Sequence, residues 1–210
     1  MAVQTLLFHF GAFQPIWQQP GLVQAGPQIL DGPTSVQVLE PSVPALTRGL
    51  ARHGWRSKGV LLQYSDPFLM RSKPLRGLQH WPGPKILACG DLHHGPQPID
   101  SLVAYLSAES HDAVLLTFNP ALLDEVRRQV SVPVSSFPPT FFRYPSAIPS
   151  TEPRLELLHV GSLGPHHTQR QNLVTALQSR KRVPFRHATT DNAEEAAKLY
   201  AQHALVLNIP

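Results

Sequence analysis

Cysteine is nearly missing from this sequence of 210 residues, which contains only Cys89. A single cysteine excludes a disulfide within the chain and removes the paired thiols of a zinc ribbon or a CxxC redox site. Long apolar runs are missing too, because no stretch approaches the roughly 20 residues that cross a bilayer. The apolar residues 2–10 lack the basic region and cleavage site of a signal peptide. We therefore expect a cytoplasmic protein without a membrane span.

Charge is also scarce, since charged residues make up 15% of the chain and hydrophobic residues 42%. This balance is typical of a folded protein with a packed core and differs from the composition of disordered chains. The formal net charge of +4 is a mild bias toward anionic ligands such as phosphates. Because the basic residues are scattered, we expect no nucleic-acid partner.

From residue 85 onward, short apolar runs alternate with amphipathic runs, a pattern that predicts strand–helix–strand units of a parallel sheet. Strands are predicted over 85–89, 112–118 and 132–137, and Asn119 with Pro120 is predicted to begin the second of the intervening helices. The pattern then stops over 138–153, a segment with five prolines that is predicted to be a domain linker. It restarts with predicted strands over 155–160, 183–187 and 204–209, a helix over 165–179, and a second helix capped by Asp191.

The first third of the chain is less regular. Strands are predicted over 5–10, 34–39 and 59–64, a helix over 43–53, and Gly- and Pro-rich loops over 11–33 and 66–84. The whole pattern predicts an α/β protein with two Rossmann-like parallel-sheet domains, of which the second is incomplete. The predicted boundaries are 1–137 for the first domain, 138–153 for the linker and 154–210 for the partial second domain.

Two turns follow predicted strands, where open parallel sheets bind ligands. The first, over 90–96, carries Asp91, His93 and His94. These side chains are suited to binding a metal, to acid–base work or to hydrogen-bonding a polar ligand, and they also fit a plain polar surface loop. A Gly-Asp-x-His sequence after a strand further resembles the first metal-binding motif of metallophosphoesterases, although the later motifs of that family are missing.

The second turn, over 161–170, places small residues before a helix N-terminus. Gly161 and Ser162 make room for an anion such as a diphosphate, and His166, His167 and Arg170 add positive charge. The turn lacks the Gly-Lys-Ser/Thr of a P-loop and the third glycine of the dinucleotide fingerprint. A tight strand-to-helix turn with surface histidines is the alternative interpretation.

Residues 159–170, HVGSLGPHHTQR, with the following helix, strand, helix and ALVLN at 204–208, resemble the start of the donor-binding half of group 1 glycosyltransferases. The likeness is greatest to the branch that includes spore-maturation-type proteins, and GDLHHG at 90–95 is similar to a turn in the acceptor-side half of its bacterial members. The resemblance implies the GT-B fold, with a nucleotide-sugar donor held mainly by the second domain and an acceptor by the first. It implies that Gly161 and Ser162 lie against the donor diphosphate and that no bound metal or cofactor is needed.

By the same resemblance, His166, His167 and Arg170 supply nearby hydrogen bonds or charge, while Asp91, His93 and His94 are candidates for the base that activates an unknown acceptor. The sequence departs from the family in two ways. Many members have Arg after the first Gly and Lys a few residues later, where this chain has Ser162 and a histidine. The family also continues beyond the last strand with an acidic donor-binding residue, so we expect a truncated second domain.

The expected function is thus a glycosyltransferase, or a truncated fragment of one. Two alternatives remain open: a metal-dependent phosphohydrolase that uses the turn from Gly90 to His94, and a non-catalytic nucleotide-binding remnant.

Overall fold

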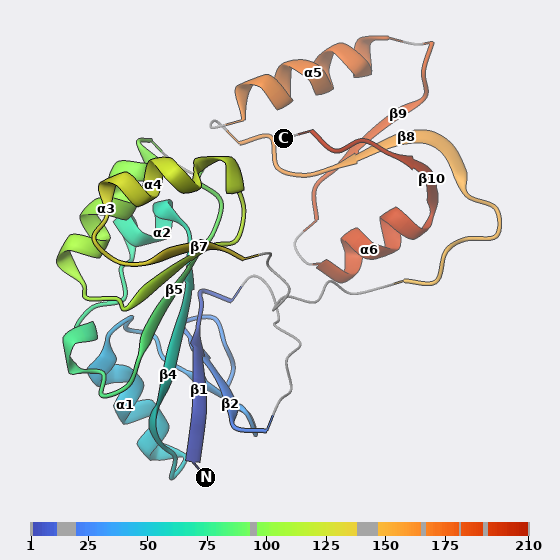
Figure 1. Ribbon diagram of the computed structural model, residues 1–210. Coiled ribbons are helices and arrows are strands. Elements are labelled where there is room, and N and C mark those ends of the chain that lie inside the picture. The colour runs from blue at the N-terminus through green and yellow to red at the C-terminus, as the bar shows by residue number, and fades with distance from the viewer. Residues whose placement is uncertain are drawn as a thin grey trace. The chain divides into compact units, whose positions relative to one another are not determined.

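The computed structural model describes residues 2–11, 20–92, 96–137, 147–164, 167–180, 182–190 and 193–209. The chain divides into two compact units, Met1–Phe142 and Arg143–Pro210. Each unit contains a parallel sheet with helices, so the protein belongs to the α/β class (Figure 1). None of the helices in these ranges combines the length and the apolar character of a membrane span.

The first unit is built on a seven-stranded sheet of order β3-β2-β1-β4-β5-β6-β7, in which all neighbouring strands are parallel. The strands are β1 (Ala2–Phe8), β2 (Leu22–Gly26), β3 (Ser35–Gln37), β4 (Arg56–Ser65), β5 (Lys85–Cys89), β6 (Ala113–Leu116) and β7 (Val134–Ser136). The first six follow the 3-2-1-4-5-6 order of Rossmann-like folds. The order reverses between β1 and β4, the position where such sheets commonly bind ligands.

Helices cover one face of this sheet. They are α1 (Val43–Arg52), α2 (Pro67–Ser72), α3 (Pro98–Ala108) and α4 (Leu123–Gln129), with single 3-10 turns η1 (Leu78–His80) and η2 (Pro120–Leu122). Leu61 belongs to the core cluster that includes residues of α1, and Leu87 to the cluster that includes residues of α3 and α4. Gln63 pairs with Leu87 and lies two residues after Leu61, so both clusters are on the same face.

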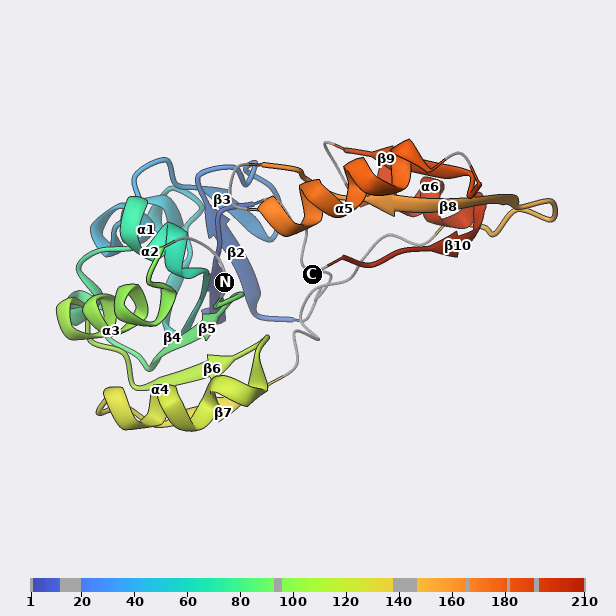
Figure 2. The same ribbon diagram turned by 90° about the horizontal axis from the view of Figure 1, so that it is seen from above.

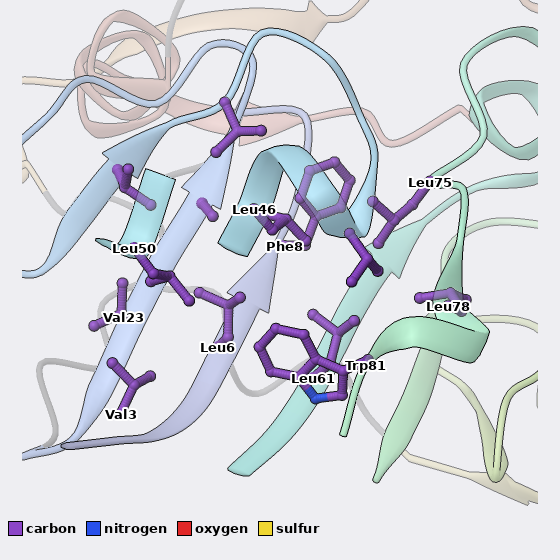
Figure 3. Close-up of a cluster of buried hydrophobic side chains, with 14 residues drawn as sticks. Val3, Leu6, Phe8, Val23, Leu46, Leu50, Leu61, Leu75, Leu78 and Trp81 are labelled. Atoms are coloured by element: carbon purple, nitrogen blue, oxygen red, sulfur yellow. The ribbon is translucent and has the colours of Figure 1, made fainter. Parts of the chain in front are cut away.

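The cluster under α1 shows how local sequence determines packing (Figure 3). Ser42 caps α1, because its Oγ accepts a hydrogen bond from the main-chain N–H of Ala45 (3.3 Å). The capped helix directs Leu46 and Leu50, one turn apart, onto the apolar side chains of β1 and β4. Trp81 closes the cluster and satisfies its indole N–H by donating to the Gly59 carbonyl (3.0 Å).

Three details of this unit differ from the sequence prediction. Strand β2 and helix α2 lie in segments that were predicted to be loops. The strand has five residues bounded by glycines, and the helix has six, so neither is long enough to establish a periodic pattern. Asn119 was predicted to cap a helix, yet it adopts a left-handed conformation (φ 55°) and forms no capping hydrogen bond. Its side-chain oxygen instead accepts from the Leu92 N–H (2.9 Å).

The second unit has a three-stranded parallel sheet of order β10-β8-β9. Its elements are β8 (Arg154–Val160), α5 (Thr168–Ser179), β9 (Phe185–Ala188), α6 (Ala193–Ala201) and β10 (His203–Val206). β8, the first strand of the unit, is therefore central. The connection through α5 leads from β8 to β9 on one side of it, and the connection through α6 leads back past β8 to β10 on the other side. Right-handed crossovers then place the two helices on opposite faces of the sheet, as seen in Figures 1 and 2. Asp191, the predicted cap of α6, lies outside the described residues.

Candidate functional site

The turn after β8 is held by hydrogen bonds to the neighbouring strand β9, within its own loop and from helix α5. The Gly161 N–H donates to the Ala188 carbonyl at the end of β9 (3.0 Å), and the Gly164 N–H donates to Ser162 Oγ (3.1 Å). Arg170, in the first turn of α5, reaches back so that its Nη1 donates to the Ser162 carbonyl (3.1 Å). The structure thus brings together three of the predicted donor-site residues, Gly161, Ser162 and Arg170.

Two histidines that the sequence analysis overlooked lie directly beneath this turn. His159 on β8 and His187 on β9 are register partners in the parallel ladder, and their rings stack at 5.4 Å with an interplanar angle of 21°. His159 is only 2% exposed, whereas His187 is half-buried. The signal that could have revealed them is a histidine near the end of each of two consecutive predicted strands, since neighbouring parallel strands end at the same edge.

The protonation of His159 follows from its hydrogen bond to the chain after β10. Its Nδ1 lies 3.1 Å from the Leu207 carbonyl, and a carbonyl only accepts, so Nδ1 carries the hydrogen. In the neutral ring, Nε2 is then a lone-pair acceptor. A Cβ atom added at Gly161 would lie 3.3 Å from this Nε2 and 3.7 Å from Arg170 Nη1. The imidazole edge and the guanidinium therefore lie on the same side of Gly161, next to the position that a side chain would occupy.

Three buried nitrogens in this cluster have no hydrogen-bond partner among the described residues: His159 Nε2, His187 Nδ1 and Arg170 Nε. Elsewhere in the described ranges, every other buried side-chain nitrogen or oxygen has a partner. Burial, and then the neighbouring His159, lower the pKa of His187. Because a buried polar group without a partner costs about 1–3 kcal/mol, the cluster of three is a candidate site for a polar ligand that supplies the missing hydrogen bonds.

Helix α5 adds further hydrogen-bond donors. Its N-cap residue is His167, whose side chain forms no capping hydrogen bond to the helix. The first-turn N–H groups of a helix have no partner within the helix, and they carry the positive end of its dipole. His166, the remaining predicted donor-site residue, lies outside the described residues.

In the first unit, polar residues follow three neighbouring strands at the carboxyl edge of the sheet. His9 follows β1, Asp66 follows β4, and the predicted residue Asp91 lies two residues after β5. Gly90 allows the ends of β4 and β5 to approach closely, because an added Cβ at this position would lie 3.1 Å from the Cβ of Asp66. His93 and His94 lie outside the described residues. Neither His9, which lies within the predicted strand 5–10, nor Asp66, two residues after the predicted strand 59–64, was predicted as a site residue.

His9 is held neutral at this edge. The Gly11 N–H donates to its Nδ1 (3.1 Å), so Nε2 carries the hydrogen and donates to Gln24 Oε1 (3.3 Å). Burial lowers the pKa of His9 to about 4. Cys89, at the end of β5, is also buried, and burial followed by the charges of Asp66 and Asp91 raises the pKa of its thiol. The Cys89 thiol is therefore not poised to act as a thiolate nucleophile at neutral pH.

The candidate metal-binding chemistry of the 90–96 turn depends on residues that are only partly described. Within the described ranges, no three His, Cys, Asp or Glu side chains are grouped closely enough to hold a metal ion. Asp91 and Asp66 are the acidic residues at this edge, and the two histidines that would complete a metal site are outside these ranges.

In comparisons with protein-family models, curated protein sequences and solved structures, no match to this chain was found.

Proposed function

We propose that this chain is a glycosyltransferase of the GT-B type, whose second unit binds the diphosphate of a nucleotide-sugar beside Gly161 and Ser162, in the turn after β8. The observation that carries the proposal is the group of three buried, unpartnered nitrogens on His159, His187 and Arg170 beside Gly161. Both units have the parallel α/β architecture that the GT-B fold requires, and the strand order of the first is Rossmann-like.

The chemistry of the turn suits a departing diphosphate. When the sugar is transferred, the bond between its anomeric carbon and the diphosphate oxygen breaks, an acceptor oxygen bonds to that carbon, and negative charge collects on the diphosphate. Arg170 and the N-terminal N–H groups of α5 are fixed donors that would stabilise this charge without rearrangement. In this proposal, Asp91 of the first unit, with His93 and His94, accepts the proton of the acceptor hydroxyl.

Binding is the first property to test. We would titrate the chain calorimetrically with UDP, GDP and their sugar conjugates, with and without EDTA. The proposal expects saturable binding that EDTA does not change. Arg170→Gln should weaken it about tenfold or more, because a charge-assisted hydrogen bond contributes about 1.5–3 kcal/mol.

Arg154→Gln is the matched control. It removes the same charge from an exposed arginine at the start of β8, where Arg154 pairs with Glu156 (3.7 Å). Its affinity for the nucleotide should be close to that of the unmodified chain. Absence of binding to every nucleotide, or an equal loss in both variants, would overturn the proposal.

A further inference from the structure

The His159–His187 pair has no role in the proposed function beyond lining the site, yet its geometry sets a condition on any anion bound there. The Leu207 carbonyl fixes the hydrogen of His159 on Nδ1, so the lone pair of Nε2 points toward Gly161. Phosphate oxygens also present lone pairs. An anion beside Gly161 is therefore repelled by a neutral His159 and attracted by a protonated one, whose Nε2–H donates to it.

We infer that a phosphoryl group binds beside Gly161 together with a proton, which is taken up from solution by the His159–His187 pair. The inference deepens the proposed function, and it rests on that function in taking the natural ligand to be the diphosphate of a nucleotide-sugar. It assigns to His159 and His187 a direct role in ligand binding and makes the affinity of the site dependent on pH.

The surrounding charges determine the direction of this dependence. Helix α5 contributes Arg170 and, at its N-cap, His167; β9 contributes His187; and the chain after β10 contributes the Leu207 carbonyl. In the empty site, burial and then the neighbouring His159 lower the pKa of His187, so its protonated form is disfavoured. The negative charge of the ligand reverses that balance. Affinity should thus rise as the pH falls, by at most about tenfold per pH unit for one proton.

Sulfate is the sharpest probe, because it carries two negative charges and does not itself titrate near neutral pH. Calorimetry in buffers of different ionisation enthalpy would count the protons taken up with sulfate at about pH 7.5, chosen one unit above the usual histidine pKa. In parallel, 15N NMR of the histidine-labelled chain would follow His159 Nε2. We expect uptake of about one proton and a change of Nε2 from bare to protonated, as linkage requires.

His159→Asn is the diagnostic variant, because the amide nitrogen of asparagine can still donate to the Leu207 carbonyl while Nε2 is lost. The variant should retain its thermal unfolding midpoint but lose most of the pH dependence of sulfate binding. His187→Asn provides a second test at the less buried partner. His203→Gln is the control. His203 is a buried histidine on β10, beside the start of β8, and its Nε2 lies 3.1 Å from Glu156. Its replacement should leave the pH dependence of sulfate binding intact.

The outcomes separate the two proposals. Sulfate binding with proton uptake but no nucleotide binding would support the inference and reject the glycosyltransferase. Nucleotide binding without a change in the protonation of either imidazole would support the function and overturn the inference. Failure of sulfate to bind, or uptake of a proton that persists in both His159→Asn and His187→Asn, would also overturn the inference.

Discussion

The hydroxyl of Tyr105 on α3 lies 2.9 Å from Oε1 of Gln63 on β4, and both side chains are buried. The same hydroxyl is 2.8 Å from the Leu75 carbonyl, so one phenol links a helix, a strand and the segment after α2. A buried polar contact of this kind specifies how α3 sits on the sheet, because this arrangement provides the hydrogen bonds that offset burial of the hydroxyl.

Replacing Tyr105 by phenylalanine should therefore lower the free energy of unfolding of the first unit by about 1–3 kcal/mol, since it removes the buried hydroxyl hydrogen that Gln63 Oε1 and the Leu75 carbonyl share. Urea unfolding followed by circular dichroism would measure the change. Tyr200→Phe, at a side chain that is 43% exposed, should change stability by less than about 0.5 kcal/mol. Equal effects of the two substitutions would contradict this role for Tyr105.

The stability of the first unit should fall in mild acid. Burial lowers the pKa of His9 and of His111 from 6.5 to about 4. Below pH 6.5 the unfolded chain therefore binds protons that the folded chain does not bind. Stability therefore decreases as the pH falls from about 6.5 to 4, by up to about 3 kcal/mol for each histidine.

Unfolding midpoints measured across this pH range would test that expectation. His111→Gln should flatten the dependence, whereas His80→Gln, at an exposed histidine, should leave it unchanged. A stability that does not change over the acid range would mean that these two imidazoles become protonated in the folded state.

Cys89 should react with thiol reagents only when the protein opens. The side chain is fully buried at the end of β5, and burial raises the pKa of the thiol above its ordinary value. The rate of labelling should rise with urea in step with unfolding. Fast labelling of the folded protein would show that the sheet edge is open at this position and that the thiol is accessible for chemistry.

Asp91→Asn should separate chemistry from donor binding. If Asp91 is the acceptor's base, its loss should slow sugar transfer about a hundredfold or more while the affinity for the nucleotide-sugar stays the same, because the proposal places the donor on the other unit. Release of the nucleoside diphosphate measures the rate. Asp124→Asn, at an exposed residue paired with Arg127 (3.4 Å), is the control and should be fully active. A reaction that is restored by divalent metal after EDTA treatment would favour the phosphohydrolase instead.

The regular part of the fold could be predicted from the sequence. β5 spans the predicted residues 85–89, and α1 ends one residue before the predicted limit, because buried parallel strands and amphipathic helices have distinct apolar periods. β2 and α2 were missed because they are too short for a period to appear. Asn119 precedes the first helical residue, Pro120, as predicted, but its side chain does not cap the helix because it accepts from a main-chain N–H distant in sequence, that of Leu92.

The candidate site was predictable only where the chain is contiguous. Gly161, Ser162 and Arg170 belong to one strand–turn–helix segment, so sequence spacing sufficed to group them. His159 and His187 meet through the pairing of β8 with β9. Strand register is a tertiary property. Until the neighbouring strand is known, a histidine in an apolar strand fits an isolated core residue as well as it fits a member of a site.

The central claim, that a phosphoryl group binds beside Gly161, is tested most directly by adding a methyl group at that position. Gly161→Ala leaves every charge in place but puts a Cβ 3.3 Å from the His159 ring. At Gly164 an added Cβ meets only Ser162 Oγ, at 3.4 Å, so Gly164→Ala is the matched control. Calorimetric titration with UDP and GDP should show about tenfold or greater loss of affinity in Gly161→Ala and little change in Gly164→Ala, as overpacking of about 1–3 kcal/mol implies. Unchanged binding in Gly161→Ala would contradict the claim.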